Sequence, residues 1–386
     1  MEYDFENLPE RRGSGCFKWD EAPEGVIPLW VADMDFKAAP FILDALRARL
    51  EHGVFGYTKV MDGYYEAVMD WFLRRRGWKI EKDWIMYVPG VIPAIACCLK
   101  AFTKPGDKVA IHAPAYNHFY TSIRNAATVL VESPLRRVGD TFEVDFDDME
   151  ARLADPAVKI FLLCNPHNPT GRVWTADELR RIGDICRRTG TMVISDEIHC
   201  EIEMPGHRFT PFAVACPDIP CVTFNSPSKN FNLAGLQIAN IICPVAEWRA
   251  KIDRAINDNE VCDVNPFGVE ALMAAYTPEG EEWLRQMNAV VWDNFTLLRD
   301  TVARELGWTV CDLQGTYLAW MDCSAAPVDT VTLQKELTDV EKVWINNGKM
   351  YGDVRYMRIN LATSRTLFAE ALLRIVAGLK RVCAAK

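Results

Sequence analysis

The chain has 386 residues, of which 49% are hydrophobic and 25% charged, and its formal net charge is -10. This length exceeds what one compact core usually organises, so we expect a large domain and a smaller one. The acidic balance argues against a nucleic-acid or anionic-membrane partner, because both select basic surfaces. The first 25 residues are polar and charged, and no apolar run approaches the roughly 18 residues of a membrane span. We therefore expect neither a secretory signal nor a spanning helix.

Short β-branched segments alternate with amphipathic helical segments through the middle of the chain. The predicted strands there lie at 84–88, 108–112, 128–132, 159–164, 192–195, 221–225 and 237–243. Several are apolar throughout, which is typical of a sheet covered on both faces. The alternation of strands and helices predicts an α/β fold with a mainly parallel sheet in three layers.

The segment 175–190 is the clearest helix between two of these strands. Thr175 and Glu178 form a capping-box pattern, and Gly190 supplies the stop. Between them an apolar residue recurs every three positions at 179, 182 and 185, which is the stripe of a helix packed on a sheet.

The pattern changes beyond about residue 285. A long helical stretch at 283–306, strands around 315–321 and 357–361, and a closing helix from Leu367 indicate a smaller α+β domain. We place the large α/β domain at 41–284 and the small α+β domain at 1–40 plus 285–386.

Thirteen cysteines are scattered along the chain, mostly inside apolar runs, and none forms a CxxC pair. The six histidines show no metal-ligand spacing. These residues predict reduced, buried thiols in a cytoplasmic protein and no metal site.

Two polar segments follow predicted strands and carry candidate chemistry. In SPSKNFN (226–232), Lys229 would stand at the carboxyl edge of the sheet, where its amine could form an imine, and Ser226 and Ser228 offer hydroxyls to a phosphate. Taken alone, Lys229 fits an exposed surface lysine better than a catalytic one. In SDEIH (195–199), Asp196 could hold a pyridine nitrogen protonated, or could simply cap the next helix.

Two further turns have the composition of a ligand site. NPHNPTG (165–171) combines two X-Pro bonds with a glycine, which fixes an irregular turn where an amide could meet a ring oxygen. An ordinary strand-to-helix loop explains the prolines and glycine but not the two asparagines. PGVIP (89–93) leads into a helix, whose first N–H groups could bind phosphate. Neither GxGxxG nor GxxxxGK[ST] occurs, so no dinucleotide or Walker cradle is predicted.

Together these motifs resemble the fold-type I pyridoxal 5′-phosphate (PLP) enzymes of the aminotransferase class I/II superfamily, over essentially the whole chain. The motifs are NPHNPTG, SDEIH and SPSKNFNLAGL (226–236). The chain is most similar to MalY/PatB-type cystathionine β-lyases (C-S lyases) at IPLWVADMDF (27–36), FGYT (55–58), PAYNHFY (114–120) and YLAWMD (317–322). The resemblance implies the PLP-dependent transferase fold, PLP as the cofactor and a homodimer.

The resemblance also implies site residues. Lys229 would form the Schiff base with PLP, Asp196 would pair with its pyridine nitrogen, and Tyr116 would stack on its ring unless it is a core aromatic. The other residues implied to hold the cofactor are Asn168 and His199 near the ring hydroxyl, Gly90, Val91, Ile92, Ser226 and Ser228 at the phosphate, and Tyr57 from the neighbouring subunit. The implied substrate contacts are Arg358 on the α-carboxylate, otherwise a surface ion pair, with Ala32 and Tyr57.

One position departs from many transaminases, which carry a phosphate-binding arginine eight residues after the lysine. That position is Gln237 here, which favours a lyase. The resemblance implies α,β-elimination from L-cysteine S-conjugates such as L-cystathionine, giving a thiol (homocysteine), pyruvate and ammonia. An amino-acid aminotransferase, which uses the same residues, stays an alternative, as does a regulatory or partner-binding role alongside catalysis.

Overall fold

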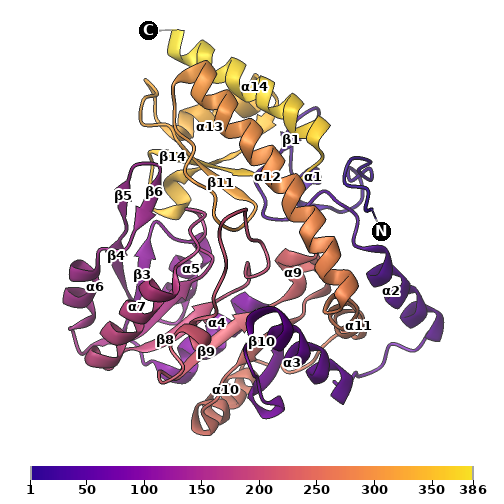
Figure 1. Cartoon of the computed structure of the whole chain (residues 1–386), viewed down its shortest axis with the longest axis vertical. Coiled ribbons are helices and arrows are strands. Elements are labelled where there is room, and N and C mark those ends of the chain that lie inside the picture. Colours follow the sequence, from indigo (N-terminus) through magenta and orange to yellow (C-terminus); the bar gives the residue numbers. More distant parts are fainter. Residues whose placement is uncertain (1, 385–386) are drawn as a thin grey trace.

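A seven-stranded sheet forms the centre of the computed structural model, which describes residues 2–384 (Figure 1). In spatial order its strands are β2 (Ile85–Val88), β10 (Ala239–Ile242), β9 (Cys221–Asn225), β8 (Met192–Asp196), β7 (Val158–Cys164), β3 (Lys108–Ala113) and β4 (Val129–Pro134). Each pair from β9 to β4 is parallel, whereas β10 is antiparallel to both of its neighbours. The predicted mainly parallel sheet is confirmed.

Helices cover both faces of this sheet and make it the middle of three layers. One face packs against α4 (Val91–Phe102), α5 (Asn117–Asn125) and α10 (Ala246–Asp258), and the other against α6 (Phe146–Leu153), α7 (Ala176–Thr189) and α8 (Phe212–Ala215). In β7, Ile160 and Leu162 join the first core, and Phe161 and Leu163 join the second. Alternate residues of a strand point to opposite faces, so an apolar strand supplies both cores at once.

Local capping chemistry sets the ends of several elements. The Thr175 side chain accepts a hydrogen bond from the Glu178 N–H while the Glu178 side chain accepts one from the Thr175 N–H, and Gly190 closes α7 with a φ of 72°. The predicted strand at 237–243 is shorter in the structure. Gln237 takes a left-handed φ of 50° and its N–H bonds the Ala234 carbonyl, so the chain is still turning there.

The C-terminal third forms a smaller α+β assembly beside the large sheet. Its three-stranded sheet has the order β11 (Leu318–Asp322), β14 (Tyr356–Asn360) and β13 (Asn346–Asn347), and its helices are α12 (Pro278–Leu306), α13 (Thr330–Asp339) and α14 (Arg365–Ala384). The long helix begins ahead of the predicted residue 283 because the Thr277 side chain caps the Gly280 N–H. In Figure 1, α12 runs from this assembly down to α11 (Pro266–Ala275), which packs against α2 (Pro40–His52) and α3 (Asp62–Arg76).

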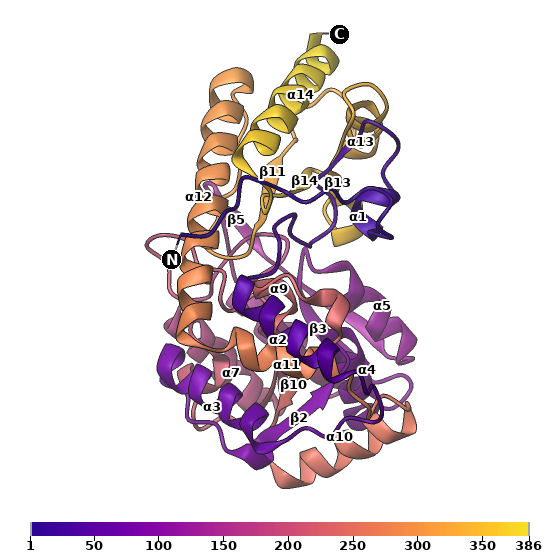
Figure 2. The same ribbon diagram turned by 90° about the vertical axis from the view of Figure 1, so that its right-hand side faces the viewer.

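The N-terminal segment lies against the C-terminal part of the chain (Figure 2). After α1 (Phe17–Asp20), the two residues of β1 (Ile27–Pro28) pair in parallel with β12 (Val343–Trp344). The sequence did not predict this pair, nor the hairpin of β5 (Arg136–Val138) and β6 (Thr141–Glu143), because strands this short have too few residues to show an alternation. The domain bounds at 41–284 and 1–40 plus 285–386 stay a prediction, and α12 runs through the second boundary.

Gly348 lies where a side chain would collide with the backbone that leads into β14. A Cβ at this position would lie 2.6 Å from the Tyr356 carbonyl oxygen and against the carbonyl oxygen of Asp353. We expect Gly348→Ala to lower the free energy of unfolding by about 1 to 3 kcal/mol, because relief requires the chain itself to move. Urea unfolding measures this. Gly63→Ala is the control, since its Cβ would have only the Met273 sulfur nearby, at 3.9 Å. Equal losses in the two variants would contradict the prediction.

Candidate active site

Three neighbouring strands bring the predicted residues to one edge of the large sheet. Cys164 at the end of β7 is opposite Asp196 at the end of β8, and Asp196 is opposite Phe224 of β9. The chain segments that follow these strands therefore leave the sheet side by side. They enclose a cavity of about 180 Å³ lined by Ala32, Pro89, Gly90, Val91, Ile92, Pro93, Tyr116, Cys164, Asn168, Asp196, Ile198, His199, Ser226, Ser228, Lys229, Ala234, Gln237 and Ile238.

Lys229 lies on α9 (Pro227–Asn230), a single turn that follows β9 directly. The Ser226 side chain caps this turn by accepting from the Ser228 N–H, and its hydroxyl donates to the Ile238 carbonyl at 2.6 Å. The Lys229 amine donates to the Ala32 carbonyl oxygen, also at 2.6 Å. Burial lowers the pKa of Lys229 to about 8, and the Arg358 charge acts in the same direction. A large fraction of the amine is therefore neutral near pH 8.

Asp196 is a buried carboxyl group that meets no basic side chain at ion-pair distance within residues 2–384. Its carboxylate accepts one backbone hydrogen bond, from the Ile198 N–H at 3.2 Å. Burial raises the pKa of Asp196 to about 7, against smaller opposing effects of this hydrogen bond and of Lys229. A cationic ligand group at this point would stabilise the ionised carboxylate.

Asn168 and His199 line the same cavity from the turns after β7 and β8. The Asn168 side-chain oxygen accepts from the Arg358 guanidinium at 3.2 Å. His199 is buried and its Nδ1 has no hydrogen-bond partner in the described chain. Burial lowers the pKa of His199 to about 3, so its ring is neutral at physiological pH. The peptide bonds before Pro166 and Pro169 in this turn are cis.

Arg358 reaches the cavity region from β14 of the small sheet. Its guanidinium donates to Asn168 and, at 3.1 Å, to the Trp30 carbonyl, and it lies over the Tyr351 ring at 4.5 Å. Only 4% of its surface is exposed. No carboxylate of residues 2–384 is within ion-pair distance of this buried cation. A buried guanidinium without a counter-ion suits binding of a ligand carboxylate.

The start of α4 also lines the cavity. Gly90 precedes this helix, and no side chain caps its first turn, so the N–H groups of Val91 and Ile92 are open to an anion. Ser226 and Ser228 line the same cavity. Tyr116, the residue before α5, is half-buried in the cavity wall, and burial raises its pKa.

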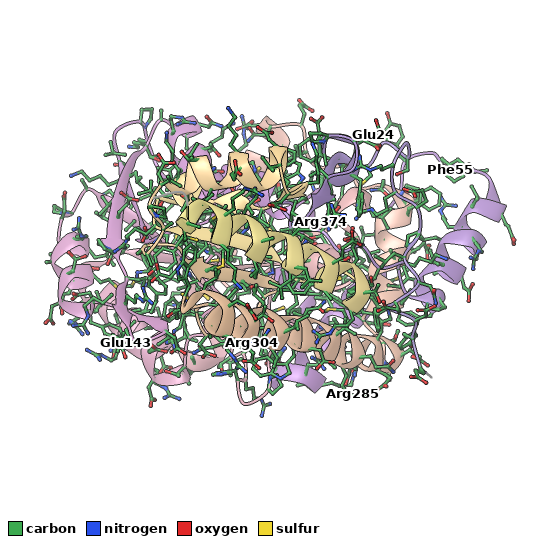
Figure 3. All side chains as sticks on the ribbon, turned by 90° about the horizontal axis from the view of Figure 1, so that it is seen from above. Glu24, Phe55, Glu143, Arg285, Arg304 and Arg374 are labelled. Atoms are coloured by element: carbon green, nitrogen blue, oxygen red, sulfur yellow. The ribbon has the colours of Figure 1, made fainter. Side chains whose placement is uncertain are left out.

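Of the predicted residues, Arg358 does not line the cavity itself but contacts Asn168, which does, and Tyr57 lies outside it altogether. Its side chain is 99% exposed and borders a surface cleft that shares Pro89 and Gln237 with the cavity wall. Its neighbour Phe55 projects from the outer edge of the molecule next to α2 (Figure 3). Within one chain, Tyr57 therefore does not join the other predicted residues.

Sequence reasoning gave no role to Tyr317, although YLAWMD was among the matching motifs. Its hydroxyl donates to the Ala32 carbonyl at 2.9 Å, the same oxygen that accepts from Lys229. The ring of His199 lies edge-on to the Tyr317 ring with centroids 5.9 Å apart. A tyrosine at the start of an otherwise apolar strand was the only available signal, and it is indistinguishable from a core aromatic in the sequence.

The family model described as aminotransferase class I and II matches residues 24–375. The chain belongs to this family. Cystathionine beta-lyase PatB of Bacillus subtilis (strain 168) is 37% identical over 97% of this chain and 99% of its own length, and Protein MalY of Escherichia coli (strain K12) is 33% identical over 98% and 100%. Cystalysin from Treponema denticola, whose structure contains a pyridoxal 5′-phosphate cofactor, superposes with a TM-score of 0.95 at 33% identity, over 99% of this chain and 100% of that one.

These relatives confirm the predicted superfamily, its PLP-dependent transferase fold and the resemblance to MalY/PatB-type proteins. Between residues 2 and 384, no helix is long and apolar enough to cross a membrane. In the same range no three His, Cys, Asp or Glu side chains are grouped as metal ligands. The roles of the individual cavity residues stay predictions.

Asp196 should make the stability of the cofactor-free protein depend on pH. Its pKa is about 7 when folded and near 3.8 when unfolded, so the folded state holds the extra proton between these values. Rising pH through this window therefore disfavours folding. From pH 5 to pH 8, we expect the stability of Asp196→Asn relative to wild type to increase by about 2 to 3 kcal/mol in urea unfolding.

Asp62→Asn is the matched control for this measurement. Asp62 is exposed, and its hydrogen bond with Lys82 lowers its pKa below the ordinary value. Its charge therefore does not change between pH 5 and pH 8, and the difference from wild type should stay flat. A flat difference for Asp196→Asn as well would refute the raised pKa.

Proposed function

We propose that this protein is a PLP-dependent carbon–sulfur β-lyase that acts on L-cysteine S-conjugates such as L-cystathionine. The products are a thiol (homocysteine from cystathionine), pyruvate and ammonia. The observation that carries the proposal is the composition of one cavity region. Near the Lys229 amine lie a buried carboxyl group, Asp196, that has no cation and a buried guanidinium, Arg358, that has no carboxylate. The name of the relative PatB gives the same reaction class.

The residues of the cavity fit PLP. The Asp196 carboxyl matches a protonated pyridine nitrogen, and His199 offers an unpartnered nitrogen beside it. The uncapped start of α4, with the Ser228 hydroxyl, matches a phosphate, whereas the Ser226 hydroxyl donates its proton to the Ile238 carbonyl. Asn168 would lie at the ring hydroxyl and Tyr116 against the ring. When bound, PLP accepts the electron pair that is left on Cα after proton removal.

Lys229 is the proposed general base. Its lowered pKa leaves a neutral amine available near pH 8, which is the state required to take the Cα proton. The C–S bond to Cβ then breaks and the thiol leaves. Water hydrolyses the remaining three-carbon fragment to pyruvate and ammonia, so one water enters for each substrate.

Arg358 is the proposed anchor of the substrate α-carboxylate. Its contacts with the Trp30 carbonyl, Asn168 and Tyr351 fix the guanidinium plane while leaving its charge uncompensated. Ala32, two residues after Trp30, lines the cavity. Binding the carboxylate here would set the Cα–H bond toward Lys229, which is a positioning effect on the reaction.

We also propose a homodimer in the cytoplasm. A tyrosine that is 99% exposed beside a cleft next to the cavity suits contact with a second copy, whose cofactor phosphate and substrate Tyr57 would reach. All thirteen cysteines are free, which suits a reducing compartment.

Incubation with L-cystathionine separates the lyase from an aminotransferase. We expect thiol and pyruvate to form without any keto acid, and a visible absorption band to accompany the PLP-bound protein. Lys229→Ala should erase the band and the activity, while Lys82→Ala, at an exposed ion pair, should keep both. Keto-acid-dependent transamination without thiol release would refute the lyase. A partner protein retained by the Lys229→Ala variant would indicate a role apart from catalysis.

Arg358→Lys tests the carboxylate site. An ammonium cannot reproduce the two-pronged bond of a guanidinium, so we expect KM for L-cystathionine to rise about 10- to 100-fold with a smaller change in kcat. Steady-state kinetics measure both constants. Arg355→Lys, at an exposed arginine three residues earlier that pairs with Asp353, is the matched control and should behave as wild type. An unchanged KM for Arg358→Lys would exclude this role.

A further inference from the structure

The Lys229 amine depends on a loop from the other end of the chain. Its acceptor, the Ala32 carbonyl oxygen, is 2.6 Å away and belongs to a residue 197 positions earlier. Ala32 lies in the loop 30–35 (WVADMD), which follows β1 and has no strand partner. Apart from one backbone bond, from the Asp35 N–H to the Ala362 carbonyl at 3.0 Å, this loop is held by side chains and not by a sheet ladder.

Two asparagine side chains bind the backbone of this loop. The Asn360 side chain donates to the carbonyls of Val31 and Asp33, on either side of Ala32, at 2.6 Å each. Asn232, three residues after Lys229, accepts from the Met34 N–H and donates to the Met34 carbonyl, both at 2.9 Å. The loop that carries Ala32 is thus tied both to β14 and to the segment that carries Lys229.

Two carboxylates of the loop, Asp33 and Asp35, pair with the cations Arg11 and Lys18, and we call these four residues the N-terminal charge cluster. The Lys18 ammonium is 2.9 Å from Asp35 and 3.6 Å from Asp33. Arg11 is 2.7 Å from Asp35 and 2.9 Å from Asp33. The side chains of Lys18 and Asp35 are 0% and 1% exposed, so this pair is fully removed from water.

Fold stability alone does not account for such a cluster. Burying two ion pairs has a desolvation cost, and apolar side chains of the same volume often stabilise a protein as well or better. Ionic hydrogen bonds differ from apolar packing in having direction. Arg11 also donates to the Met34 carbonyl at 2.9 Å, so the cluster fixes both side chains and backbone on the C-terminal side of Ala32.

We propose that the N-terminal charge cluster positions the Ala32 carbonyl as the docking point of the Lys229 amine whenever this amine is free of the cofactor. The inference rests on the proposed function, in which the substrate amine takes the place of Lys229. Lys18 is then a positioning residue that acts on Lys229 through Asp33, Asp35 and the loop. Tyr317 is a second one, because its hydroxyl holds the same oxygen.

Lys18→Met removes the buried ammonium and keeps most of the side-chain volume. Two rates are measured, the formation of the visible band when cofactor-free protein is mixed with PLP, and kcat for L-cystathionine. We expect both to fall about tenfold, because the amine is no longer held in place, while KM changes by less than about twofold because Arg358 is untouched. Lys82→Met, which breaks an exposed lysine–aspartate pair, should leave both rates unchanged.

Two further variants separate positioning from folding. Loss of one partner leaves Asp35 undercompensated in the interior and lowers thermal stability. Lys18→Met with Asp35→Asn removes both charges of the pair, so we expect thermal stability to recover but the two rates to stay low. Tyr317→Phe removes a single hydroxyl from the Ala32 oxygen and should slow both rates in a fully folded protein.

The outcomes distinguish this inference from the proposed function. Rates within about twofold of wild type in folded Lys18→Met overturn it. If that variant does not fold, wild-type rates in both other variants overturn it instead. If wild-type protein forms no visible band with PLP, the proposed function fails and this inference with it.

Discussion

The parallel ends of β7, β8 and β9 are the constraint on which the rest of the site depends. Because these strands share direction and register, the turns that follow them leave the sheet at one edge. Their connections cross the faces of the sheet, so this edge is free for a ligand. Asn168, Asp196 and Lys229 reach a single cavity for this reason, although each belongs to a separate turn.

Two buried ionisable groups without counter-ions, one acidic and one basic, give this region its chemical character. Asp196 belongs to the large sheet and Arg358 to the small one, and each is buried without a counter-ion among the described residues. Such burial disfavours the charged form of a carboxyl group, as the raised pKa of Asp196 records. A ligand with a cationic ring and an anionic carboxylate would relieve both penalties at once. Such a ligand would link the large sheet, through Asp196, to the small sheet, through Arg358.

The sequence predicted those features that are encoded locally. These features depend on neighbouring residues only. They are the apolar strand β7, the capped ends of α7 and the turn after β9 that carries Lys229, and all are present in the structure. It could not predict that Lys18 is buried, because FKWD has the composition of a surface turn and its partner Asp35 is folded back from further along the chain. The prediction that the strand β10 begins at residue 237 was wrong for a different reason. Nothing in the residue type announces that Gln237 takes a left-handed conformation.

The contact of Arg358 with the Trp30 carbonyl has a consequence for how the protein is made. These residues are 328 positions apart. The strand β1 likewise pairs with β12, which lies far along the chain. Contacts of such sequence separation form late and slowly compared with local ones. During synthesis, the large sheet can assemble while the N-terminal segment is still unpaired, because its partners have not yet left the ribosome. Addition of β14 to the small sheet therefore also brings Arg358 to the site. A chain that ends before β14 lacks the proposed carboxylate anchor.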